Sequence, residues 1–540
     1  MRTKSINIVM IAAALAFPLA GQQISAERIR AHTKFLASDY MEGRGVGARG
    51  GDLATEYLAT AFAVAGALPA GENGTYFQRV PLVGVETQPG VQLSAVSKGK
   101  TVPFRWAEDF VGLNHKQQAS GRLTAEAVFV GHGISAPEFQ WDDYKGTDVR
   151  GKVVVLFTNE PPSEKADFFG GRALTYYGRW TYKYEEALRR GAAGAIIIHT
   201  TPTAGYGWDV VRNSWGHENP FVKLAPNEAA LAFAGWVTRE AGEKLLGLSG
   251  RNVESLLKAA ESRDFKPIPL NVRINAVIPS KVRQIDTRNV AAVVPGSDPE
   301  LKKEAVVFTA HWDHLGIGTP VDGDAIYNGA VDNATGCAML IEMARAWAEL
   351  PQKPRRSALF LAVTAEEGGL RGSEFYANHP IFPAGKTAAA FNFDAIHPYG
   401  RTKDVVLTGA ERTTLWPVVE AAANRMGLVI KPDPRPEQGS YYRSDHFSMA
   451  TVGIPAFTVE AGSDVLGKPP GFADQLFREF NARHYHQPSD EFHDDWDFSG
   501  LEQMARFGIL IALDTANQDA LPTWRAGDEF LPARQKSGVK

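Results

Sequence analysis

The sequence predicts an α/β fold: a three-layer sandwich with a mostly parallel central sheet, together with an inserted, mainly β second domain. Strand and helix patterns alternate through residues 300–515, which indicates βαβ units around a parallel sheet. Three short apolar runs, 304–310, 358–363 and 386–393, are typical of strands that are buried on both faces. Further strand patterns at 122–262 fall outside this alternation and indicate a separate insertion.

The N-terminal segment, residues 1–21, is predicted to be a signal peptide. Arg2 and Lys4 precede an apolar core at 8–17 that is too short to span a bilayer. No later run is apolar enough for a membrane helix, so the mature chain is expected to be exported, periplasmic or secreted. Cys337 is the only cysteine, which excludes an intrachain disulfide.

The composition is that of an ordinary globular protein. The chain has 540 residues, of which 44% are hydrophobic and 22% charged, and a net charge of −4. This length allows more than one domain. Because there is no basic excess, no nucleic-acid partner is predicted, and no feature of the sequence specifies an oligomeric state.

The main domain is predicted to consist of 27–121 and 263–516, on either side of the insertion at 122–262, with a polar surface tail at 517–540. The insertion is expected to fold apart from the catalytic residues and yet to help shape the cleft. Its aromatic run at 176–184 has two interpretations, core packing or a wall of that cleft. The expected elements are strands at 123–131, 151–157, 193–199 and 266–294, and helices within 25–68 and at 180–190, 338–348, 418–426 and 501–513.

Candidate metal ligands follow the three apolar strands. His311 follows the first strand, Glu367 the second and Asp394 the third. In open α/β sheets, ligands bind beyond the carboxyl ends of the strands. Asp332, just before the next predicted helix, and His486 complete a set of five. No one of these residues is persuasive alone, since each has a common structural role, but together they predict a metal site.

The ligand types indicate a hydrolytic zinc centre. Imidazole and carboxylate without thiolate suit catalytic Zn²⁺. Two histidines and three carboxylates are too many for one open zinc ion and suit two ions that share a bridging carboxylate. Glu366 then remains free as a general base. Spacing alone does not choose between His311 and His314, or between His486 and His484.

Several motifs together carry a family resemblance. They lie at 311–313, 329–336, 365–373, 392–394, 443–446, 453–455 and 485–486. In these motifs the sequence resembles the M28-type zinc exopeptidases, which include bacterial aminopeptidases and glutamate carboxypeptidase-like proteins. The segment 122–262 is similar to the protease-associated (PA) domain often inserted in that family, and residues 41–44 resemble its N-terminal segment.

The resemblance implies a role for each matching residue. Asp332 is expected to bridge two zinc ions, with His311 and Asp394 on one ion and Glu367 and His486 on the other. Glu366 is expected to activate the bridging water, and Asp313 to accept a hydrogen bond from His311 and fix its tautomer. The family pattern favours His311 and His486 over their neighbouring histidines. Further candidates for supporting or substrate contacts are Arg443, Asp445 and His446.

The implied activity is hydrolysis of peptide substrates, with release of N-terminal amino acids. An anionic pocket beside the metals favours the α-ammonium group of a substrate. Arg443 favours instead a substrate carboxylate, as in a glutamate carboxypeptidase-like carboxypeptidase or dipeptidase, unless Asp445 neutralises it in a salt bridge. Two distant alternatives are a glutaminyl cyclase, whose chemistry uses one metal, and a non-catalytic binding protein, which would be expected to lose ligands.

Overall fold

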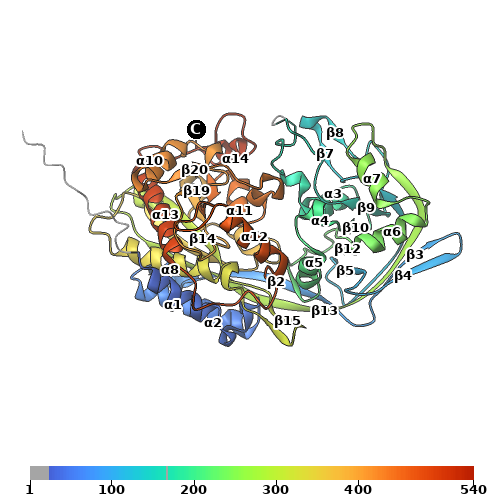
Figure 1. Cartoon of the computed structure of the whole chain (residues 1–540), viewed down its shortest axis with the longest axis horizontal. Helices are drawn as coiled ribbons and strands as arrows, with labels where there is room; N and C mark the ends of the chain where they lie inside the picture. The colour runs from blue at the N-terminus through green and yellow to red at the C-terminus, as the bar shows by residue number, and fades with distance from the viewer. Residues whose placement is uncertain (1–23, 166–167, 540) are drawn as a thin grey trace, which may run out of the picture.

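The chain forms two lobes that lie side by side (Figure 1). The computed structural model describes residues 24–165 and 168–539, so the predicted signal peptide at 1–21 lies outside the described residues. The first lobe contains the N-terminal helices and the C-terminal half of the chain, and the second contains the middle of the chain. None of the helices in the described part of the chain has the length and apolarity needed to span a membrane.

The first lobe is the predicted three-layer sandwich. Its strands run in the order β21 (Ala456–Thr458), β18 (Thr387–Asn392), β14 (Ala305–His311), β17 (Ser357–Val363) and β13 (Ile268–Val294). The first four are parallel, and β13 is antiparallel to β17. Every residue of β14, β17 and β18 is buried, as their apolar sequences require of strands covered on both faces.

Helices cover both faces of this sheet. One face packs against α1 (Ala26–Leu36), α2 (Arg49–Val64), α8 (Thr335–Ala348), α10 (Trp416–Met426) and α13 (Ser499–Asn517). The other face packs against α9 (Arg371–Asn378) and α11 (His446–Thr451). The predicted helices at 338–348, 418–426 and 501–513 all lie within these bounds. The alternating strands and helices therefore place the carboxyl ends of the parallel strands at one edge, where the predicted ligands begin.

The second lobe has its own sheet, in which β6 (Ser120–Phe129), β9 (Val153–Phe157), β10 (Gly194–Ile198) and β12 (Phe233–Val237) are parallel. It also carries α3 (Trp180–Arg189), α5 (Trp208–Trp215), α6 (Arg239–Gly247) and α7 (Val253–Ala260). β5 (Phe110–Leu113) pairs with β12, and β3 (Gln92–Ser97) pairs with both β4 (Lys100–Phe104) and β13. This lobe thus uses residues on the N-terminal side of 122, and a PA-type domain here remains a prediction.

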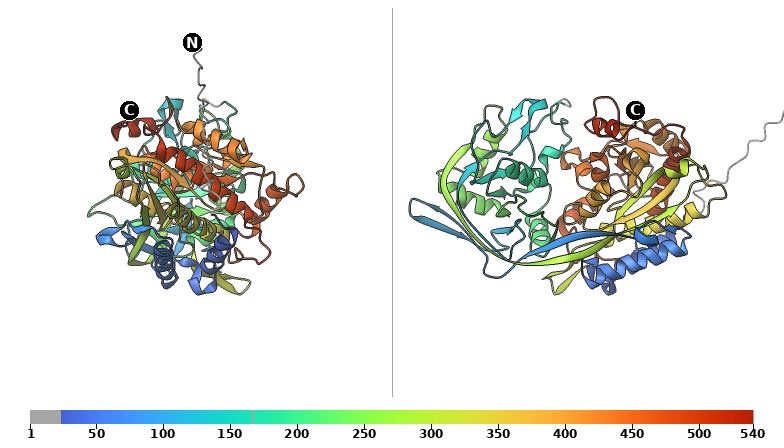
Figure 2. Two further views of the ribbon diagram at one scale, coloured as in Figure 1. Left: turned by 90° about the vertical axis from the view of Figure 1, so that its left-hand side faces the viewer. Right: turned by 180° about the vertical axis from the view of Figure 1, so that it is seen from behind.

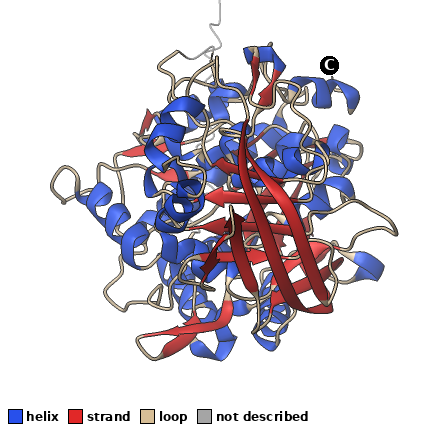
Figure 3. Cartoon of the chain, turned by 90° about the vertical axis from the view of Figure 1, so that its right-hand side faces the viewer, coloured by secondary structure: helices blue, strands red, loops and turns tan. Residues whose placement is uncertain are grey.

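Two long strands join the lobes. β2 (Phe77–Thr87) pairs with the second half of β13 in an antiparallel ladder from Phe77↔Val290 to Thr87↔Ser280. The first half of β13 pairs with β6 in the second lobe. Figure 2 shows this ribbon passing beneath both lobes, and Figure 3 shows its twist from the side of the second lobe. The two lobes are therefore connected by hydrogen-bonded strands and not by a flexible linker.

The C-terminal tail differs in part from the prediction of a surface segment. Trp524 is buried and donates a hydrogen bond from Nε1 to the main-chain oxygen of Gly453. Arg534, in the short helix α14 (Leu531–Lys536), is also buried and donates to the carbonyls of Pro522 and Ala384. Most of the tail lies at the surface as predicted, and the prediction fails only where a few anchoring side chains bury part of the segment.

Candidate metal centre

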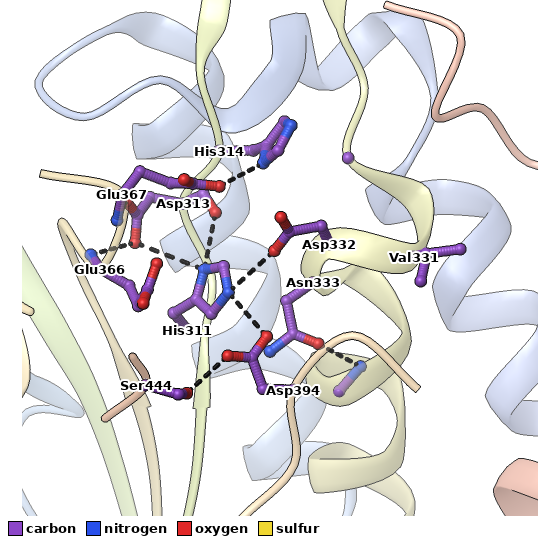
Figure 4. A network of polar contacts seen from close by, with 12 residues as sticks. His311, Asp313, His314, Val331, Asp332, Asn333, Glu366, Glu367, Asp394 and Ser444 are labelled. Atoms are coloured by element: carbon purple, nitrogen blue, oxygen red, sulfur yellow. Dashed lines mark hydrogen bonds and ion pairs between the residues drawn. The ribbon is translucent and has the colours of Figure 1, made fainter. Parts of the chain in front are cut away.

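The five predicted ligands meet at the carboxyl edge of the central sheet, and Figure 4 shows four of them, His311, Asp332, Glu367 and Asp394. His311 is the last residue of β14, and Asp394 lies just beyond β18. The Nε2 atom of His311 is 3.1 Å from Oδ1 of Asp394 and 3.2 Å from Oδ1 of Asp332. On the other side, Nε2 of His486 is 3.0 Å from Oε2 of Glu367 and 3.5 Å from Oδ2 of Asp332. Each oxygen of Asp332 thus faces a different histidine and carboxylate pair.

The site buries several carboxylates close to one another. The side chains of Asp332 and Glu367 are 7% and 8% exposed. Burial raises the pKa of Glu366 well above its usual range, and the nearby carboxylates of Glu367 and Asp394 add to the effect of burial. Ligand atoms of His311, Asp332 and Glu367 lie within 4.8 Å of one another. This donor set and its excess negative charge fit divalent metal ions.

The structure shows which histidine of each close pair faces the site, a choice that spacing alone left open. His484 is turned away from the site, with its Nδ1 atom 3.0 Å from the hydroxyl of Ser489. His314 is buried beside the site, and its Nδ1 atom is 2.6 Å from Oε1 of Glu367. His314 therefore holds a predicted ligand, while His311 and His486 face the shared carboxylate Asp332.

Asp313 supports the site differently from the prediction. The Nδ1–H group of His311 donates to the main-chain oxygen of Asp313 at 3.0 Å, whereas the carboxylate oxygen is 3.9 Å away. The carboxylate instead accepts the main-chain N–H groups of Glu366 at 3.1 Å and Glu367 at 3.4 Å. The main chain fixes the tautomer of His311, which leaves the side chain of Asp313 to shape the turn after β17.

The loop that carries Asp332 is held by two residues that sequence reasoning missed. The carboxylate of Asp490 accepts the main-chain N–H groups of Val331 at 2.9 Å and Asp332 at 3.1 Å. Arg44 is 1% exposed, and its guanidinium donates to five main-chain carbonyls, one of which is that of Asp332 itself at 3.5 Å. The other acceptors are Leu36, Trp312, Asn328 and Gly329, at 2.6 to 2.8 Å. In the sequence, only the resemblance at 41–44 pointed to a role for Arg44, and nothing pointed to Asp490.

Arg443, Asp445 and His446 occupy three different environments. The Arg443 guanidinium lies 5.5 Å from the centre of the Tyr206 ring and 3.5 Å from the hydroxyl of Tyr485. It forms no ion pair with Asp445 in the described part of the chain, so the predicted neutralising salt bridge is wrong. His446 packs against Tyr441, away from the ligands. Between Arg443 and Asp445, Ser444 donates to Asp394 at 2.5 Å.

A cleft of about 680 Å³ lies between the lobes, beside these ligands. The first lobe contributes Glu366, Glu367 and Arg443 to its lining, and the second contributes Tyr176 and Trp180. Other aromatic residues of the same run, such as Tyr182, are buried within the second lobe. The aromatic run therefore serves both predicted purposes, core packing and a wall of the cleft.

The α/β sandwich therefore carries a buried histidine and carboxylate cluster, suited to metal binding, at the carboxyl edge of its parallel strands. The family model described as Peptidase family M28 matches residues 289–509. The chain thus carries an M28 peptidase domain, and this match includes every predicted ligand.

Similar structures cover both lobes. An aminopeptidase from Aneurinibacillus sp. strain AM-1 is 20% identical, with a TM-score of 0.54, and the match covers 95% of this chain and 99% of that one. A Peptidase M28 precursor from Shewanella amazonensis SB2B is 18% identical, with a TM-score of 0.50 and coverage of 94% and 97%. At these identities the matches establish the fold.

A curated relative is the vacuolar membrane protease of Verticillium alfalfae, which is 27% identical over 131 residues. The match spans 24% of this chain and 12% of that protein. The likeness is therefore confined to a small part of both chains.

Proposed function

We propose that this protein is an exported di-zinc exopeptidase that releases N-terminal amino acids from peptides. The observation that carries the proposal is the placement of Asp332, whose two oxygens face His311 on one side and His486 on the other. A carboxylate in this position suits a bridge between two metal ions. His311 and Asp394 would hold one zinc ion, and His486 and Glu367 the other.

Zinc, when bound, supplies Lewis acidity towards a scissile carbonyl and an attacking water. The residues of the chain handle the proton. Glu366 is free of the five ligand positions and lines the cleft, and its pKa is raised by burial, which suits a group that must accept a proton. Glu366 takes a proton from the attacking water and delivers it to the leaving amine.

The carboxylates of the cleft favour an N-terminal substrate group. Glu366 and Glu367 line the cleft beside the other ligands, and such a field attracts an α-ammonium group and repels an α-carboxylate. This supports aminopeptidase activity over the alternatives on the same fold.

A second candidate, a carboxypeptidase or dipeptidase, is favoured by one observation. Arg443 lines the cleft without an ion pair to Asp445, so its guanidinium is available to bind a substrate carboxylate in a bidentate manner. The two candidates therefore differ in which end of the peptide the site recognises.

A set of matched peptides separates these candidates. One peptide is offered with free termini, then N-acetylated, then C-amidated, and the released amino acid is identified. An aminopeptidase loses cleavage on acetylation and keeps it on amidation. The reverse pattern would establish the carboxypeptidase and assign Arg443 as its anchor.

Metal content tests the bridging role of Asp332 directly. We expect protein purified without chelator, and supplied with zinc, to retain two zinc ions per chain. A content that remains at one ion under zinc-replete conditions would contradict the bridge. Cell fractionation and N-terminal sequencing of the mature protein test export, which rests on the predicted signal peptide at 1–21.

A further inference from the structure

The second lobe makes direct contact with a predicted metal ligand of the first lobe. At the end of α5, the Oγ atom of Ser214 is 2.8 Å from the Nδ1 atom of His486. In the preceding position, the Nδ2 group of Asn213 donates to the main-chain oxygen of His486 at 3.0 Å. The expectation that the insertion folds apart from the catalytic ligands is therefore wrong at this point.

His486 depends on such contacts because no regular element holds it. It follows the end of α12 (Phe472–Arg483) in an irregular loop, with a positive φ of 56°. The other predicted ligands lie at or just beyond the ends of the central strands or, for Asp332, in a loop fixed by Arg44 and Asp490. On its open side, His486 meets α5 of the second lobe.

The contact with Ser214 decides which nitrogen of His486 is available. Nε2 faces Glu367 and Asp332, so a ligand role requires a lone pair on Nε2 and the proton on Nδ1. A hydroxyl oxygen at 2.8 Å accepts that proton and stabilises this tautomer and ring orientation. Asn213 fixes the backbone of the same residue.

The second lobe holds α5 in place. Val211 and Trp215 of this helix are buried in the core that also contains residues of β9, β10 and β12. Beyond the helix, the Asn219 side chain donates to the main-chain oxygen of Ser214 at 3.2 Å. Ser214 is thus fixed relative to the second lobe while it contacts a ligand of the first.

We propose that Ser214 and Asn213 are positioning residues, through which the second lobe completes the metal site around His486. This inference rests on the proposed zinc centre. It follows that the docked position of the second lobe sets the affinity of the chain for the metal ion held by His486 and Glu367, and leaves the ion held by His311 and Asp394 unaffected.

The test measures zinc affinity in the full-length chain, by competition with a chromophoric chelator. We expect Ser214→Ala to weaken the binding of one of the two zinc ions by about 10–100-fold, the usual effect of removing an outer contact to a metal ligand. Ser214→Thr keeps the hydroxyl and should retain most of the affinity. Excess zinc should restore turnover in Ser214→Ala, because the chemical groups are intact.

Ser249→Ala is the matched control, since the Ser249 hydroxyl lies in the same lobe and donates only to the main-chain oxygen of Leu246. It should bind both ions normally. Unchanged binding of both ions by Ser214→Ala would overturn the proposal, and so would equal losses in Ser214→Ala and Ser249→Ala, which would mark a general destabilisation of the lobe. If the unsubstituted protein binds fewer than two ions, the failure belongs to the proposed function instead.

Discussion

Glu366 and Glu367 are neighbours in the chain with different surroundings. Glu367 contacts His486 and His314, which outweigh burial and lower its pKa to about 2. It is therefore ionised, as its proposed role as a metal ligand requires. For Glu366, burial has the largest effect and raises the pKa. The pKa values of these two adjacent carboxyl groups are thus shifted in opposite directions by their surroundings. The shifts suit the proposed roles of Glu366 as a base and Glu367 as a metal ligand.

The two glutamates should respond differently to the same substitution. Glu366→Gln should keep both zinc ions and lose turnover by about 10²–10⁴-fold, because only proton transfer is removed. Glu367→Gln should lower zinc content as well. Elemental analysis beside kcat measurements checks both variants. Metal loss in Glu366→Gln with full activity in Glu367→Gln would reverse the assignment.

Arg44 is a second residue whose surroundings predict a large effect. Its buried guanidinium satisfies carbonyls from the first helix, the turn after β14 and the Asp332 loop. Arg44→Met should lower the free energy of unfolding by on the order of 3 kcal/mol, because several charged hydrogen bonds are lost and their acceptors stay buried. Denaturant titration measures it.

Arg49→Met is the comparison for Arg44, because the Arg49 side chain is 69% exposed and pairs with Glu42. Removal of an exposed ion pair should cost less than about 1 kcal/mol. Equal losses in both variants would show that the buried contacts of Arg44 add nothing to stability.

Among the elements, the turn from β17 to α9 has little room to vary. Asn289 of β13 accepts the main-chain N–H of Thr364 at 3.0 Å and donates to the oxygen of Gly372 at 2.9 Å. A Cβ atom on Gly372 would lie 2.3 Å from the Thr364 oxygen and 2.5 Å from Oδ1 of Asn289. This close approach fixes the turn that presents both glutamates.

Gly372→Ala should therefore displace the turn. We expect a loss of about 1–3 kcal/mol in unfolding free energy, as overpacking usually costs, together with weaker zinc binding. Gly247→Ala, at the end of α6, is the control, since a Cβ there meets nothing within 4 Å. Calorimetry with a zinc titration would contradict the prediction if Gly372→Ala matched the control.

The whole molecule needs the metal ions most at alkaline pH. Without metal, burial raises the pKa of Asp445 to about 7, so the folded state keeps a proton that the unfolded chain releases above about pH 4. Although burial opposes it, the Glu367 and Asp332 carboxylates raise the pKa of His486 to about 10. The contribution of each group to stability is lost as pH rises. For Asp445 the loss occurs between about pH 4 and pH 7, and for His486 between about pH 6.5 and pH 10.

Titrating groups away from the site affect both forms alike, so the comparison is between chelator-treated and zinc-loaded protein from pH 5 to pH 9. The gap in Tm between the two forms is expected to widen with pH, because zinc replaces the bound protons. Scanning calorimetry at matched ionic strength measures it. A gap that narrows with pH would mean that the site is not the source of the pH dependence.

The sequence predicted what lies next to a regular element. His311, Glu367 and Asp394 were accessible because each follows an apolar strand, and parallel strands end at one edge. The sequence pattern did not reveal Asp490, Arg44 or Ser214. Each reaches the site from a loop or helix whose position is set by tertiary packing, and such a position has no periodic signature in the sequence. The boundary predicted at 122 missed β3 and β5 for the same reason: strand pairing across the lobe is not visible in local pattern.

The shared strand β13 also bears on the order in which the molecule is made. Its first half pairs with β3 and β6, so the sheet of the second lobe has all its strands once synthesis passes residue 280. Every predicted ligand comes later, from His311 onward. We expect the second lobe to fold first during translation, since domains fold as units as they emerge. The second half of β13, already paired with β2, then offers an edge on which β17 and the rest of the central sheet can pair.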